Sequence, residues 1–201
     1  MKNGLIGLVF SAFVSLSCLN FSCVTSSNIP ENEKQRLMQE VKSKDYIMGI
    51  EGLGAGGYTK HLTEKLCSEL GMCGYSTAGN PEEHKKIILE AKKNGRKVYF
   101  VLHSLAFNAV KEFTGELEKQ GIEIDCVYSM DLTIPDKIHG NIKKFVDIKG
   151  NVFYAFRGRE LNKNDLENKD TLLEVKIIEA DHLRLPEESF SYIRDELSSI
   201  R

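Results

Sequence analysis

The sequence lacks the features that several large classes of protein require. Its 27 lysines and arginines are balanced by 29 aspartates and glutamates, so the formal net charge is only −2. Binding to the phosphate backbone of nucleic acid usually needs a broad basic surface, and this balance therefore predicts no nucleic-acid partner. Neither Cys-x-x-Cys nor His-Glu-x-x-His occurs, so no metal site is predicted. Internal repeats and low-complexity segments are also absent.

The first 26 residues differ from the rest of the chain. Met1-Lys2-Asn3 is a short positive start, and an uncharged, mostly apolar run extends from Leu5 to Leu19. This run has the length of the apolar part of a signal peptide and is short for a membrane span. We therefore predict a signal peptide over residues 1–26, with an uncleaved membrane anchor as the alternative.

Two cysteines in this segment, Cys18 and Cys23, are candidate lipidation sites of a bacterial lipoprotein. The position three residues before each cysteine is normally aliphatic in such proteins, whereas here it is Ser15 or Asn20. Membrane anchoring through an N-terminal lipid therefore stays an alternative to a cleaved, free protein. Both versions predict export, to the periplasm or cell envelope.

Export would place the three remaining cysteines in a compartment where disulfides form. Cys67 and Cys73 are close enough in sequence to bridge a short loop, and Cys126 has no neighbour of this kind. Buried free thiols are the alternative for all three.

Strand and helix patterns alternate over residues 45–201, which we predict to be one domain, preceded by a linker and helix over 27–44. This order predicts the α/β class, with a mostly parallel sheet flanked by helices on both faces. Such sheets bind ligands beyond the carboxyl ends of their strands. The predicted strands are 46–50, 72–76, 98–102, 125–130, 151–156 and 173–178, and the main predicted helices are 58–70, 81–94, 106–117 and 190–200.

A serine lies at the sharpest predicted strand-to-helix turn. The apolar run Val98–Leu102 ends at His103-Ser104, and a helical pattern follows directly. A serine in such a turn presents its hydroxyl at the sheet edge beside a helix N-terminus, as a nucleophile requires, although an N-cap is the alternative role. The match to the G-x-S-x-G nucleophile elbow is partial, because Leu102 and Ala106 replace the two glycines.

An acid and a histidine follow two later predicted strands, in the order Ser104, Asp131, His182. His182 would take the serine proton and return it to the leaving group, and Asp131 would orient and stabilise the imidazole. The alternatives are a turn-forming aspartate and a surface histidine. Asp136 and Asp181 are poorer candidates for the acid, since Asp136 lies beyond a proline and Asp181 adjoins His182 on an extended segment.

These segments resemble the α/β-hydrolase superfamily, and within it the small bacterial lipase-like and thioesterase-like serine hydrolases. The matching pieces are 49–54, 101–106, 128–131 and 181–182. The resemblance implies a minimal α/β-hydrolase fold without a large cap, with Ser104 as nucleophile, Asp131 as acid and His182 as base. It implies a small-molecule or lipid ester as substrate and no cofactor.

The glycine-rich segment 52–57 after the first strand has two interpretations. It satisfies G-x-G-x-x-G, the dinucleotide-binding pattern, but the end of the second strand lacks the acidic residue that this pattern requires. In the hydrolase interpretation, an N–H of Leu53 or Gly54 joins that of Leu105 in an oxyanion hole. A plain flexible turn is the third possibility.

The other histidines carry no role in this chemistry. His61 and His84 fall on predicted helices, and we expect both to face solvent. His139 lies in a glycine-containing loop after Asp131, where an ordinary loop position is expected and a position lining the site is the alternative.

The leading prediction is a serine hydrolase that cleaves a carboxylic ester or thioester through an acyl-enzyme on Ser104. The alternative is a non-catalytic binding or structural lipoprotein of the envelope on the same fold. Leu102 in the elbow and the small size of the domain favour this alternative. Both hypotheses stay open at this point, because the same fold supports catalytic and non-catalytic proteins.

Overall fold

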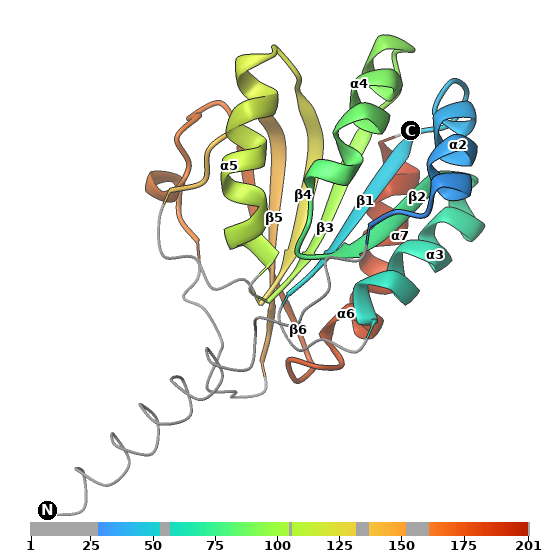
Figure 1. Ribbon diagram of the computed structural model, residues 1–201. Helices are drawn as coiled ribbons and strands as arrows, with labels where there is room; N and C mark the ends of the chain where they lie inside the picture. The colour runs from blue at the N-terminus through green and yellow to red at the C-terminus, as the bar shows by residue number, and fades with distance from the viewer. Residues whose placement is uncertain (1–27, 53–56, 105, 132–136, 152–160, 201) are drawn as a thin grey trace, which may run out of the picture.

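The computed structural model describes residues 28–200, apart from 53–56, 105, 132–136 and 152–160. These residues form three layers, with helices on both faces of a six-stranded, entirely parallel sheet in the order β2-β1-β3-β4-β5-β6 (Figure 1). The predicted fold class is confirmed. The strands are β1 (Tyr46–Glu51), β2 (Cys73–Ala78), β3 (Val98–His103), β4 (Ile124–Met130), β5 (Ile142–Gly150) and β6 (Leu172–Ile178).

The helices divide between the two faces according to their apolar stripes. One face is covered by the helices over residues 31–40, 85–93 and 106–119, and the other face by the helices over residues 58–70, 185–188 and 190–199 (Figure 1). The predicted helix 58–70 matches the observed one at both ends, because glycines in the left-handed conformation, Gly57 and Gly71, flank it. The helices are α2 (Glu31–Glu40), α3 (Tyr58–Leu70), α4 (Lys85–Lys93), α5 (Ala106–Lys119), α6 (Leu185–Glu188) and α7 (Phe190–Ser199), with 3₁₀ turns η2 (Glu82–His84) and η3 (Lys163–Asp165).

One strand differs from the prediction. The fifth strand is β5 at Ile142–Gly150, whereas the sequence pattern favoured 151–156, of which 152–156 lie outside the described residues. The charged residues of β5 kept it from being predicted as a buried strand, since alternating charges normally indicate a solvent-facing segment. Here Asp147 and Lys149 are fully buried, and their Oδ1 and Nζ atoms lie 3.3 Å apart. Burial is tolerated because each charge has an opposite partner.

Helix α2 belongs to the packed unit. Leu37 and the neighbouring Val41 are fully buried, and Ile29 is 2% exposed. All three lie in the apolar cluster beneath α4, and α2 contacts α4 and β2. The core therefore takes in residues from Ile29 onward, ahead of the domain boundary expected at residue 45.

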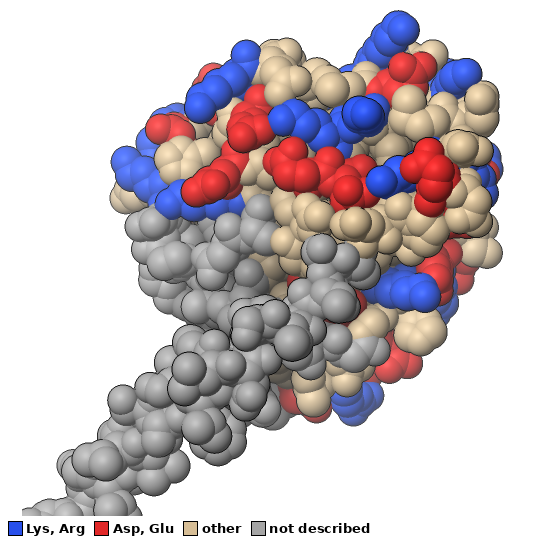
Figure 2. Space-filling model, viewed as in Figure 1, with Lys and Arg blue, Asp and Glu red and all other residues tan. Residues whose placement is uncertain are grey.

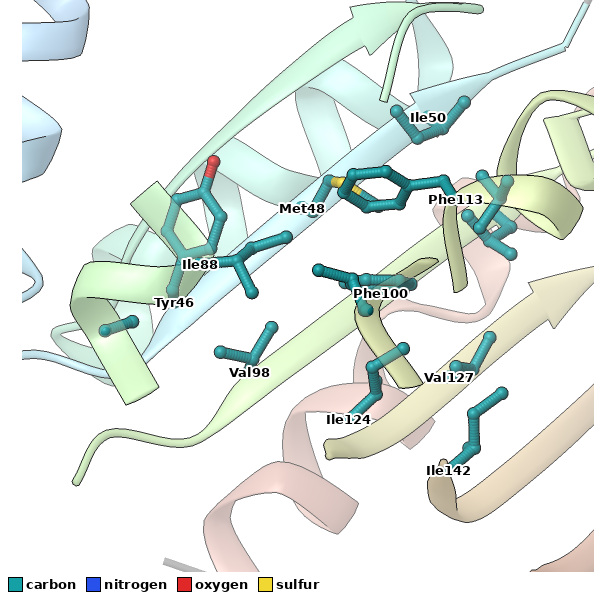
Figure 3. Packing of buried hydrophobic residues seen from close by; sticks show 14 of the residues in the cluster. Tyr46, Met48, Ile50, Ile88, Val98, Phe100, Phe113, Ile124, Val127 and Ile142 are labelled. Carbon is teal, nitrogen blue, oxygen red and sulfur yellow. The ribbon is translucent and has the colours of Figure 1, made fainter. Parts of the chain in front are cut away.

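The larger core lies between the sheet and helices α2, α4 and α5 (Figure 3). Phe100 of β3 stacks on Phe113 of α5, with ring centroids 6.3 Å apart. Apolar residues at every second position of β1 and β3 supply its floor, including Met48 and Val98 (Figure 3). This packing holds α5 over β3 and so positions the turn that joins them.

A buried histidine lies beside this core. His84 was expected to face solvent, but it is fully buried. Its Nδ1 lies 2.6 Å from the Tyr46 hydroxyl and its Nε2 lies 3.0 Å from Thr77 Oγ1. Thr77 Oγ1 donates to the Asn80 carbonyl, so it accepts from His84 Nε2–H, and His84 Nδ1 accepts from Tyr46. The expectation was wrong because helix periodicity does not reveal polar partners on strands, here Tyr46 on β1 and Thr77 on β2.

The surface carries mixed charge. On the face shown in Figure 2, Lys and Arg side chains alternate with Asp and Glu over the described helices. His61 is exposed as expected, and His139 pairs with Glu167 on the surface. Cys67, Cys73 and Cys126 are free thiols. Across the described ranges, no helix combines the length and apolarity of a membrane span.

Candidate active site

The candidate site lies where the strand order of the sheet reverses. Chain order runs outward from β1 to β2 on one side and from β3 to β6 on the other, so the carboxyl ends of β1 and β3 mark the switch point. Ligands of parallel sheets bind at such points, because the helices on either side diverge there. Ser104 follows β3 directly, is partly exposed, and donates its N–H to the Met130 carbonyl at 3.0 Å.

The backbone is strained at two of the predicted site residues. Ser104 has φ of 59° and Asp131 has φ of 47°, and among the described residues they are the only non-glycine residues with positive φ. This conformation costs on the order of 1–3 kcal/mol for a residue with a side chain, and it concentrates at functional sites. A nucleophilic serine on a strand-to-helix elbow has such strain.

Asp131 and His182 meet although they lie 51 positions apart in the sequence. His182 Nδ1 is 3.2 Å from Asp131 Oδ2, and both side chains are buried. The other carboxylate oxygen, Oδ1, accepts the Gly150 N–H at 3.0 Å. Burial alone would raise the pKa of Asp131, but the hydrogen bonds with His182 and Gly150 outweigh it, so the pKa lies below its usual range. Asp131 is therefore a carboxylate at neutral pH, suited to hold an imidazole in one tautomer.

His103, the residue before Ser104, is in direct contact with His182. Its ring stacks on that of His182 with centroids 4.6 Å apart, and its Nε2 donates to the His182 carbonyl at 3.0 Å. Burial, aided by repulsion from His182, lowers the pKa of His103 to about 4, so it is neutral near pH 7. The ring of Tyr58 on α3 meets the His103 ring edge-on, with ring centroids 6.4 Å apart. Ser104 is thus one residue away from a side chain in direct contact with His182.

Asp181, another candidate acid, has different partners. Asp181 Oδ1 accepts the N–H groups of Leu183 and Arg184, both at 3.0 Å, and so supports the turn into α6. Asp136 lies outside the described residues. Of the acids described, Asp131 is the one that contacts the His182 ring.

Leu102, the larger departure from the elbow pattern, points into the core. It is 1% exposed and belongs to the apolar cluster under α4 and α5, which also contains Ala106. The bulky side chain is therefore accommodated by packing.

The amino end of α3 is occupied by a carboxylate of the chain itself. The Thr59 N–H donates to Glu51 Oε1 at 3.3 Å, and Glu51 is 7% exposed. A dinucleotide phosphate would need this position, and a second negative charge beside Glu51 is unfavourable. The geometry therefore disfavours the dinucleotide interpretation.

Several predicted positions lie outside the described residues. These are the oxyanion candidates Leu53, Gly54 and Leu105 and the lipidation candidates Cys18 and Cys23. Within the part of the chain that the structure describes, no group of three or more His, Cys, Asp or Glu side chains could hold a metal ion.

Sequence reasoning missed the supporting roles of His103 and Gly150. A Cβ at Gly150 would lie 2.5 Å from the Ala180 carbonyl oxygen and 3.5 Å from Asp131 Oδ2. Glycine is needed there because the chain leading to His182 crosses close to the end of β5. The signal available in the sequence was a glycine at the end of a charged segment, which is ambiguous without the sheet order.

No protein-family model matches the sequence, and no curated protein is significantly similar to it. Among solved structures, the chain is similar to Est1E from Butyrivibrio proteoclasticus, with a TM-score of 0.45 and 11% sequence identity. That match covers 79% of this chain and 87% of the other.

Proposed function

We propose that this protein is a serine hydrolase that cleaves a carboxylic ester or thioester through an acyl-enzyme on Ser104. His182 acts as the general base, and Asp131 orients and stabilises its ring. No cofactor is needed for this reaction, because the nucleophile, the base and the acid are all side chains of the chain.

The chemistry follows from the tautomer that Asp131 selects. A carboxylate accepts only, so the proton of neutral His182 lies on Nδ1, and Nε2 is the ring nitrogen that would take the proton of the Ser104 hydroxyl. Attack of Ser104 Oγ on the carbonyl carbon transfers the serine proton to Nε2. The imidazolium then gives that proton to the leaving alcohol or thiol. A water molecule, activated in the same way, releases the acid and regenerates Ser104.

The proposal rests on two observations made at the same residues: the positive backbone φ of Ser104 and Asp131, and the contact of Asp131 with His182. A serine that merely capped a helix would not need a positive φ, since N-caps adopt extended backbone angles. A structural aspartate would not need one either.

A fluorophosphonate probe tests the nucleophile, because it reacts with activated serines. The wild-type protein should be labelled, and Ser104→Ala should lose all labelling. Ser43→Ala is the matched control, since Ser43 is exposed at the opposite end of the sheet, and it should be labelled like the wild type. His182→Ala should lose most of the labelling while its circular dichroism stays native.

Turnover identifies the substrate class. Short-chain and long-chain p-nitrophenyl esters and an acyl thioester should be compared at equal concentration, and hydrolysis of at least one should depend on Ser104. Folded wild-type protein that neither reacts with the probe nor turns over any ester would instead be a non-catalytic binding or structural protein of the envelope.

We further propose that the protein acts outside the cytoplasm, because residues 1–26 have the pattern of a signal peptide. Intact-mass analysis of the protein from membrane and periplasmic fractions tests this. We expect loss of the leader, with or without an added lipid on Cys18 or Cys23, and an unmodified chain beginning at Met1 would refute it.

A further inference from the structure

The outer edge of β6 is unusually apolar. Five large hydrophobic side chains are exposed among the described residues, and three of them lie on this strand: Leu172 at 57%, Val175 at 39% and Ile177 at 45%. β6 is the last strand of the sheet, and within the described ranges it pairs with β5 alone. It contains no proline or glycine, and its seven residues run without interruption. An open edge of this kind can pair with another strand.

The peptide groups of β6 show which residues are free to pair. The Asn151 N–H donates to the Ile178 carbonyl at 3.0 Å, so the peptide groups of the even-numbered residues point toward the β5 side. Alternate residues of a strand direct their peptide groups to opposite sides. The N–H and C=O groups of Leu173, Val175 and Ile177 therefore point outward. No strand in the described part of the chain receives them.

The side chains of β6 are self-complementary around Val175. The strand reads Leu-Leu-Glu-Val-Lys-Ile-Ile from 172 to 178. In an antiparallel pair of two copies with Val175 opposite itself, Glu174 lies opposite Lys176 of the other copy. The flanking pairs are then all apolar: Leu173 with Ile177, and Leu172 with Ile178. Opposite charges and apolar pairs in these positions stabilise sheets, by roughly 0.2–1 kcal/mol each.

This alignment also satisfies the peptide groups. Val175 opposite Val175 is a hydrogen-bonded pair that uses the outward peptide groups, and Leu173 opposite Ile177 is another. Shifting the alignment by two residues keeps the peptide pattern but places Glu174 opposite Glu174, or Lys176 opposite Lys176. Shifting by one residue mismatches the peptide groups. A single alignment therefore meets both requirements.

Glu174 and Lys176 lie on the same face of the sheet, the one that α7 covers. Glu174 accepts from the Tyr192 hydroxyl at 2.5 Å and from Lys144 Nζ at 2.9 Å, and Lys176 Nζ lies 5.1 Å from the centre of the Tyr192 ring. Both side chains thus lie on the α7 face of the sheet. In an antiparallel pair, directly opposite residues share a face, so each Glu174 would meet Lys176 of the other copy there.

We propose that the partner of this edge is a second copy of the chain, and that the protein forms a two-fold symmetric homodimer through antiparallel β6 strands. The two six-stranded sheets then join into one sheet of twelve strands. Such a contact is isologous, so it closes at two copies and leaves no β6 edge free.

Mass in solution is the first test. All 201 residues together have a mass of 22.7 kDa, and sedimentation velocity should give about twice the mass of the single chain that is purified, as measured by mass spectrometry. Val175→Lys places two like charges on the two-fold axis, and Lys176→Glu places two acids opposite each other. Both should sediment as monomers. Lys60→Glu is the matched control, since Lys60 is 62% exposed on α3, and this variant should stay dimeric.

Mixing tests the pairing of the charges. Glu174→Lys and Lys176→Glu should each be monomeric alone and should form a heterodimer when combined, because each then supplies the charges that the other lacks. A wild-type monomer would overturn the proposal. So would a dimer that persists in both Val175→Lys and Lys176→Glu, because another surface would then hold it.

Cross-linking tests the alignment even if a charged variant fails to fold. In the proposed pair the Cα atoms of Val175 and its copy are about 5.5 Å apart, within the range of a disulfide. Val175→Cys should therefore form a covalent dimer under mild oxidation. Leu172→Cys, on the same strand and more exposed than Val175, should not, since its copy lies six residues away, or about 20 Å. Equal cross-linking of the two variants, or none in Val175→Cys, would contradict this alignment.

Discussion

Two buried histidine networks lie on the same sheet, and they are built differently. His84 is enclosed by Tyr46 and Thr77, and both of its ring nitrogens are hydrogen bonded. His103 and His182 stack on each other at the carboxyl edge, where Ser104 and Asp131 have positive φ. The His103 Nδ1 is buried and has no hydrogen-bond partner among the described residues.

The difference separates stability from function. A fully satisfied network stabilises one conformation and has nothing left to react. A strained network with an unused nitrogen costs free energy, which the rest of the fold must offset. The first network should therefore control unfolding, and the second should control turnover.

Catalysis should change more than stability when Asp131 is altered. Asp131→Asn should reduce kcat about 10⁴-fold, because the amide favours the wrong tautomer of His182. Asp181→Asn is the matched control, since Asp181 adjoins His182 but, among the described residues, its carboxylate accepts from backbone N–H groups of the following turn and not from the His182 ring. Steady-state kinetics on the best p-nitrophenyl ester measures both. A variant order reversed from this, with Asp181 essential, would exchange the roles of the two acids.

Breaking the other network should affect stability and spare chemistry. His84→Ala removes a buried ring and leaves the Tyr46 hydroxyl without its acceptor, at a cost of about 2–5 kcal/mol. Denaturant unfolding measures this loss. Activity per folded molecule should stay within about twofold of the wild type, which a titration of probe-reactive sites can normalise. A large fall in kcat would show that the two networks are coupled.

The pH dependence of stability should report His84. Burial lowers the pKa of His84 to about 3, against about 6.5 in the unfolded chain. Between these values the unfolded state binds a proton that the folded state excludes, so the free energy of unfolding falls as the pH decreases from 6.5 toward 3. Above pH 6.5 this histidine contributes no pH dependence.

Comparison with a non-titrating variant isolates that contribution. His84→Gln should show a shallower decline between pH 6 and 4.5, by up to about 1.4 kcal/mol per pH unit. His103, with a pKa of about 4, contributes in the same direction in both proteins and cancels in the difference. Parallel pH profiles of the two proteins would mean that His84 is not the group responsible.

A small difference in stability is expected between two substitutions of Ser104. Ser104→Gly should be more stable than Ser104→Ala by about 1 kcal/mol, because glycine adopts a φ of 59° without strain. Both variants should be inactive. Thermal unfolding should place the glycine variant about 2–4 °C higher for each kcal/mol. An alanine variant as stable as the glycine variant would mean that the backbone relaxes and stores no strain there.

Several features of this protein could be derived from local patterns. The predicted bounds of helix 58–70 are correct because the glycines at its two ends are local signals. Strand β3 was predicted because a continuous apolar run indicates a buried strand without reference to its neighbours. The positions of Ser104, Asp131 and His182 at strand ends also followed, since parallel strands bring their carboxyl ends to one edge whatever their order.

Local patterns were enough to predict the class of fold and the residues that lie at the carboxyl edge of the sheet, because both depend on the period of apolar residues and on turn chemistry. Which polar groups meet depends on how segments distant in the chain pack against each other. Strand β5 was hidden by charges that become acceptable once Asp147 lies beside Lys149, and His84 became a core residue once Tyr46 and Thr77 met its ring. In the same way, His103 reaches His182 across 79 positions. Burial of a polar group is decided by its partner, and a partner distant in the chain leaves no trace in the local pattern.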